Sequence, residues 1–268
     1  MKYLVAVPIA FAAASLAIGE TPQKIDVSSF PSQAKLIDTV VVPVPSEIFG
    51  ALDRVSRVHW DQVLRATKDQ AVGESQSQIA LQLGLIIAEG FIAVQAQNTA
   101  EVKNIGGTVR KLSKALGVEK HVTEHANAIL KSADAKDWIT VRKELDRTLQ
   151  NVRTAMLDLG SEPLSQLISL GGWLRGTEAL TDVVGKDYTP ESAELLHQPI
   201  LLDFFHKRLA SMPATIKKNP VIDDMQKGML EIRPLVGVAD GTQISERSVK
   251  DVNLVATRLV KSINAKIN

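Results

Sequence analysis

The sequence predicts an all-α protein: a multi-helix bundle of about eight to ten helices, preceded by an extended N-terminal arm. Three observations support this fold class. From residue 46 onward, apolar residues recur at helical spacing in one segment after another. Short connections that contain Gly, Pro and helix-capping side chains separate these segments. Outside Val40–Val44, no run shows the alternation of apolar and polar residues that marks a half-buried strand.

Residues 1–19 have the pattern of a secretory signal peptide. Lys2 precedes Tyr3–Ile18, a stretch without charge, and Ala17-Ile18-Gly19 offers the small residues that favour cleavage before Glu20. The uncharged stretch is short for a membrane-spanning helix. We therefore expect an exported protein, periplasmic or secreted, whose mature chain begins at Glu20.

Residues 20–45 are expected to form an extended linker or arm. Proline follows Thr21, Phe30 and Val42 in this stretch, and each proline fixes φ and removes a backbone hydrogen-bond donor. No helical period runs through it. Residues 46–268 are then expected to form a single helical domain.

The helices of this domain are predicted from their ends as well as from their apolar period. Ser, Thr and Asp precede several of them as caps, glycine ends others, and proline stands near several starts. In order, we expect a helix from Ser46, then Glu74–Gln97, Thr99–Leu116, Val118–Ala133, one introduced by Asp134 and Asp137 that reaches Leu159, Glu162–Val184, one from Thr189, Leu201–Met212, short pieces divided by Pro213, Pro220 and Pro234, and a last helix from Ser245 to Ile267.

Ile79–Ala96 is the most apolar segment after the signal peptide. Its neighbourhood carries a narrow polar stripe, because Gln78, Gln82 and Glu89 lie within about 40° of one another on a helix. A membrane-spanning helix would bury Glu89 in lipid, which is costly. The segment is therefore predicted as the central helix of a soluble bundle.

Small residues and charges suggest how this helix meets the one at residues 164–184. Glycine inside a helix costs about 1 kcal/mol relative to alanine, so Gly84, Gly172 and Gly176 are predicted to allow close helix packing. Arg175 lies on an apolar face and Glu89 is the only charge in residues 79–96. Since a buried charge needs a partner, we expect Arg175 to meet Glu89. The rival expectation is a local pair of Arg175 with Glu178 and a solvent-facing Glu89.

Composition excludes several classes of function. The chain has no cysteine, so disulfides, thiolate metal sites and cysteine nucleophiles are absent. Its 31 basic and 30 acidic residues nearly cancel, so we expect no nucleic-acid partner. No dinucleotide-binding fingerprint occurs, and Glu194-Leu195-Leu196-His197 is only one of the two Glu-x-x-His pairs that a diiron bundle requires besides two further helical glutamates. We therefore expect no cofactor.

His121-Val122-Thr123-Glu124-His125 resembles the H-x-x-E-H motif of the inverted zinc metallopeptidases. Two histidines four residues apart can share a helix face and hold zinc, while the glutamate serves as a base. No third ligand is assignable downstream. His121, Glu124 and His125 are the metal candidates, and histidines on a solvated helix are the alternative.

These features favour an exported, non-catalytic helical protein with a binding or structural role in the cell envelope. Its partner, a protein or a small molecule, is not identified by the sequence. One alternative is a zinc-dependent hydrolase that uses residues 121–125. The other is a membrane-associated helical protein that uses residues 79–96, although we expect no membrane contact once the signal peptide is removed.

Overall fold

The computed structural model describes residues 45–55, 58–67, 71–239 and 242–265. Every regular element in these ranges is a helix, and nine helices have seven or more residues. The predicted all-α multi-helix bundle is therefore confirmed. The predicted signal peptide and most of the predicted arm, up to residue 44, lie outside the described residues.

The helices follow one another with short connections. Their bounds are α1 (Pro45–Val55), α2 (Trp60–Val63), α3 (Gln76–Gln95), α4 (Thr99–Ala115), the 3-10 helix η2 (Glu119–His121), α5 (Thr123–Asp134), α6 (Trp138–Asp158), α7 (Glu162–Lys186), α8 (Pro190–Ala193), the 3-10 helix η3 (Glu194–Leu196), α9 (Pro199–Ser211), α10 (Ala214–Lys217), α11 (Pro220–Val236) and α12 (Glu246–Asn264).

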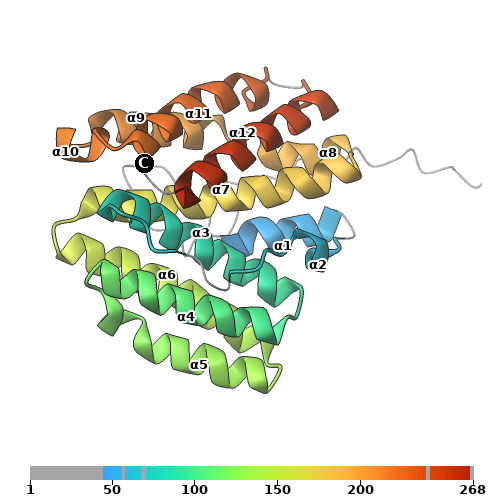
Figure 1. The fold of residues 1–268 in the computed structure, drawn as a ribbon. Coiled ribbons are helices and arrows are strands. Elements are labelled where there is room, and N and C mark those ends of the chain that lie inside the picture. The colour runs from blue at the N-terminus through green and yellow to red at the C-terminus, as the bar shows by residue number, and fades with distance from the viewer. Residues whose placement is uncertain (1–44, 56–57, 68–70, 240–241, 266–268) are drawn as a thin grey trace, which may run out of the picture.

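Helices α3 and α7 lie side by side in the middle of the molecule and share its most extensive helix contact (Figure 1). Helices α4, α5 and α6 cover one side of this central pair, and α9, α11 and α12 cover the other. Helix α1 contacts both central helices. The predicted role of the apolar segment is thus confirmed: α3 is the core helix of the bundle.

Capping side chains set several of the helix boundaries. Ser75 accepts a hydrogen bond from the N–H of Gln78 at the start of α3, and Asp137 accepts one from Thr140 at the start of α6. Asn98 caps α4 in the same way, where the sequence suggested Thr99. The left-handed φ of 53° at Gln97 ends the path of α3.

Two expectations about helix continuity were wrong. Residues 118–133 do not form one helix, because η2 ends at His121 and α5 begins at Thr123. Pro234 does not divide the chain, since it lies in the last turn of the 17-residue helix α11. Proline there removes a single backbone hydrogen bond, and the apolar face of α11, which buries Met225, Met229, Ile232 and Val236, outweighs that loss.

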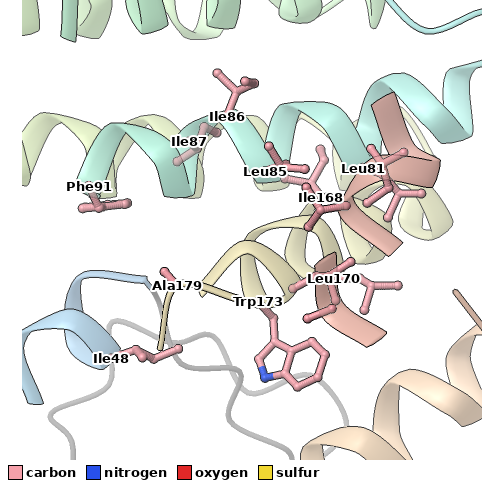
Figure 2. Close-up of a cluster of buried hydrophobic side chains, with 14 of the residues drawn as sticks. Ile48, Leu81, Leu85, Ile86, Ile87, Phe91, Ile168, Leu170, Trp173 and Ala179 are labelled. Atoms are coloured by element: carbon pink, nitrogen blue, oxygen red, sulfur yellow. The ribbon is translucent and has the colours of Figure 1, made fainter. Parts of the chain in front are cut away.

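The backbones of α3 and α7 touch through glycines. A Cβ added to Gly84 would collide with the carbonyl oxygen of Ile168 and approach the nitrogen of Gly172, and one added to Gly171 would collide with the carbonyl oxygen of Leu81. Leu81, Leu85 and Ile168 lie between α3 and α7 near this contact, whereas the ring of Trp173 points away from α3 (Figure 2). Gly84 and Gly172 therefore lie at the close contact that the sequence predicted.

Gly176 is a correction to that prediction. A Cβ at this position would meet only Cδ1 of Ile48 on α1, at the ordinary distance of 3.7 Å. The helical spacing of Gly176 from Gly172 placed it on a shared stripe, but Gly176 faces Ile48 on α1, while its neighbour Arg175 still reaches Glu89 on α3. Gly171, its neighbour in sequence, makes the backbone contact instead.

Candidate functional site

The structure brings Glu89 and Arg175 together in the centre of the molecule. Both side chains are about 1% exposed. Nε of Arg175 donates a hydrogen bond to Oε2 of Glu89 at 2.5 Å, and Nη2 donates to Oε1 at 3.3 Å. This two-armed contact joins α3 to α7, and a charge-assisted pair of this kind is the tolerable way to bury both charges.

The local partner Glu178 takes part in the same network. Its Oε2 lies 3.5 Å from Nη1 of Arg175, and its Oε1 accepts a hydrogen bond from Nη2 of Arg65 at 2.6 Å. Nη2 of Arg175 also donates to the carbonyl oxygen of Val63 at 2.8 Å. Arg175 therefore meets Glu89 as expected and also lies within ion-pair distance of Glu178, whereas the rival expectation of a solvent-facing Glu89 is wrong, since Glu89 is buried. We call Arg65, Glu89, Arg175 and Glu178 the buried ion network, and its two positive and two negative charges balance.

One atom of the buried ion network lacks a hydrogen bond. Oε2 of Glu178 is enclosed and accepts none from any residue that the structure describes. Its nearest positive charge is the guanidinium of Arg175, through the 3.5 Å ion pair. Attraction between these charges compensates in part for the missing hydrogen bond, since charge interactions strengthen where water is excluded.

The described residues between α2 and α3 that belong to no helix lie against the polar stripe of α3. We call residues 64–67 and 71–74 the connecting segment. The backbone N–H of Arg65 donates to Oε1 of Glu89 at 2.6 Å. Further along, the N–H of Gly73 donates to Oε1 of Gln82 at 2.8 Å, and that of Glu74 to Oε1 of Gln78 at 3.0 Å. The side chains of the stripe thus accept hydrogen bonds from backbone N–H groups of the connecting segment that have no partner in a helix or a strand.

Two further contacts complete this arrangement, and the sequence indicated neither. Glu101 on α4 accepts hydrogen bonds at Oε1 from both the N–H and the hydroxyl of Thr67, at 2.7 and 2.6 Å. Nε2 of Gln78 donates to the carbonyl oxygens of Ile263 and Ala265 near the end of α12. Glu101 resembles any acidic residue in a first helical turn, so its sequence position gave no sign of this contact.

The H-x-x-E-H segment does not form the continuous helix face that its spacing suggested. His121 ends η2, whereas Glu124 and His125 belong to α5. Both ring nitrogens of His125 already have partners. Nδ1 lies 2.7 Å from Oε2 of Glu144, and Nε2 lies 2.7 Å from Nδ2 of Asn151.

These partners occupy both ring nitrogens of His125. Burial opposes ionisation of Glu144, but hydrogen bonds from His125 and Arg147 outweigh burial and lower the pKa of Glu144 below its usual value. Glu144 is therefore a carboxylate that accepts the proton on Nδ1, and Nε2 accepts from the amide of Asn151. A metal ion at His125 would have to displace one of these contacts. Among the described residues, no three His, Asp or Glu side chains gather as a metal site.

Comparison with known protein families, with curated proteins and with solved structures finds no match to this chain. Within the described part of the chain, α3 is the one helix long and apolar enough to cross a membrane, and its whole apolar window is buried inside the fold. To span a membrane, α3 would have to leave the buried ion network and its contact with α7.

Proposed function

We propose that this protein is an exported, non-catalytic helical protein with a binding or structural role in the cell envelope. The observation that carries the proposal is how the polar groups of the core are used. Glu89, Glu101, Gln78 and Gln82 accept hydrogen bonds from backbone N–H groups of the connecting segment. These groups hold the fold together, and this is the role that the geometry supports best.

A catalytic carboxylate needs a proton or a substrate within reach. Glu89 is enclosed and neutralised by Arg175, and Oε1 of Glu178 accepts from Arg65. These contacts hold both carboxylates in one position. Such an arrangement supports a structural role for the buried ion network, with recognition left to the surface of the bundle.

The proposed location rests on residues 1–19, which carry the pattern of a signal peptide. Cell fractionation followed by sequencing of the N-terminus tests it. We expect the protein outside the cytoplasm with Glu20 as its first residue. Recovery in the cytoplasm with Met1 intact would contradict export.

Metal analysis of the purified protein tests the non-catalytic part of the proposal against the hydrolase alternative. We expect no stoichiometric zinc, and the same melting temperature with and without a chelator. One zinc ion per chain, lost together with hydrolytic activity on chelation and in a His125→Ala variant, would favour the hydrolase. A variant at His197, outside the H-x-x-E-H segment, serves as the control.

A further inference from the structure

Arg153 on α6 is a buried charge for which the fold provides no partner. Its side chain is 5% exposed. It makes no hydrogen bond, ion pair or ring contact with any residue that the structure describes. Only its main chain has such a contact: the carbonyl oxygen of Arg153 accepts a hydrogen bond from the hydroxyl of Ser165 on α7.

An unpaired buried guanidinium is costly. Arginine keeps its charge in proteins and carries five N–H donors in a rigid fork. Removing such a group from water without a compensating acceptor is strongly unfavourable. Burial alone lowers the pKa of Arg153, with no carboxylate nearby to raise it. A group of this kind in a native fold needs an explanation.

The guanidinium of Arg153 is still reachable from outside. The side-chain atoms that are fully enclosed without a partner are on Ser113, Glu178, His197 and His206, and no nitrogen of Arg153 is among them. Each nitrogen therefore keeps a small contact with solvent.

We propose that Arg153 is the anchor of a binding site for a small oxyanion, a carboxylate or a phosphate taken from solution. The planar fork of arginine matches both groups and binds them through two parallel hydrogen bonds. No acidic side chain near Arg153 competes for these donors. The 5% exposure of the side chain favours a small ligand, because only a small part of the fork can be reached from solution.

This site deepens the proposed binding role by naming the chemistry of the ligand, and it rests on that role. Its test does not depend on export or on metal content. If the protein is exported and free of metal but binds no oxyanion, the proposed ligand class is wrong and the proposed function still stands. Cytoplasmic retention or bound zinc would contradict the proposed function whatever Arg153 binds.

The test is the melting temperature of the purified protein in sodium phosphate and in sodium acetate, against sodium chloride at matched ionic strength. A ligand that binds only the folded state raises the melting temperature with a saturable concentration dependence. Phosphate also stabilises folded proteins without binding them, because it is excluded from the protein surface, and this effect does not saturate. Two variants therefore separate specific binding from this general effect. Arg153→Gln removes the proposed anchor. Arg147→Gln removes the same charge from a side chain on α6 that is 64% exposed.

We expect a saturable rise of several degrees in the wild type and in Arg147→Gln, and none in Arg153→Gln. A rise with phosphate, with acetate or with both supports the site and identifies which oxyanion it takes. An Arg153→Gln variant that keeps the rise overturns the proposal. So does a wild-type protein without a saturable component in either salt, a result that depends on no variant.

Discussion

Two buried arginines on neighbouring helices have opposite surroundings. Arg175 on α7 donates to Glu89 and to the carbonyl oxygen of Val63, and it lies within ion-pair distance of Glu178. Arg153 on α6 has no partner among the described residues. Burial alone therefore does not reveal the role of a charged side chain. Its role follows from whether it has partners and from which parts of the chain those partners come.

Two of the three partners of Arg175 come from distant parts of the chain. Val63 ends α2, Glu89 lies in α3, and Glu178 follows one turn later in α7. The same Glu89 accepts the N–H of Arg65, so the contact of α3 with α7 also holds the connecting segment. This arrangement makes the buried ion network part of the fold itself. Arg153 joins no distant segments through its side chain, and its loss should not disturb the packing.

The largest expected effect comes from breaking the pair of Arg175 with Glu89. We expect Glu89→Gln to lower the free energy of unfolding by about 3–5 kcal/mol, because it leaves a buried guanidinium undercompensated. Chemical denaturation measures this loss. Glu246→Gln is the control, since its exposed pair with Lys250 is worth about 0–1 kcal/mol. A loss at Glu89 as small as that control would make the buried ion network energetically equivalent to a surface pair.

The backbone contact that positions the buried ion network gives the next effect. We expect Gly84→Ala to cost about 1–3 kcal/mol, because the new Cβ would collide with the carbonyl oxygen of Ile168 and force α3 away from α7. Gly176→Ala is the matched control. Its Cβ meets Ile48 at an ordinary distance, and alanine favours the helix by up to about 1 kcal/mol. Equal losses of unfolding free energy in the two variants would contradict this assignment of the contact.

Asp146 on α6 sharpens the comparison, because a carboxyl group can lose its charge where an arginine cannot. Burial, assisted by the nearby charge of Glu47, raises the pKa of Asp146 to about 6, against the hydrogen bond from Ser46 and the charge of Arg142. Its folded-state pKa thus exceeds its unfolded value of 3.8. The protonated form is compatible with the fold, and ionisation destabilises it.

Stability should therefore fall as the pH rises from about 4 to about 6, by about 1–2 kcal/mol once partial exposure is allowed for. The measurement is the denaturation midpoint across this range for the wild type and for Asp146→Asn. The variant should lack this part of the pH dependence. An identical profile in the two proteins would show that Asp146 does not ionise in this range.

Much of the fold was accessible from the sequence, because apolar period and capping residues determine where helices begin, end and face. The stripe of Gln78, Gln82 and Glu89 correctly marked the polar side of a buried helix. The position of the connecting segment along the stripe was not predictable from the sequence. Its hydrogen bonds to the stripe are donated by backbone N–H groups, which every residue except proline has, so no residue type marks them. Glu101 was missed for the same reason.

Arg153 was missed for a different reason. It lies about 40° from Leu149 around α6, at the edge of the apolar face, where an arginine commonly keeps its charged end in water. Whether that end is paired, hydrated or enclosed depends on the helix packed beside it. Periodicity reveals the face of a side chain but not its neighbours, and so it also assigned Gly176 to the wrong contact.

The most direct test of the difference between the two arginines is the free energy of unfolding of Arg175→Met and Arg153→Met, measured in parallel in buffer without phosphate or carboxylates. We predict that Arg175→Met loses about 3–5 kcal/mol, because Glu89 is left buried without its guanidinium partner and Glu178 keeps only its pair with Arg65. We predict that Arg153→Met is as stable as the wild type or more so, because it removes an unpaired charge. Similar losses in the two variants would contradict the account.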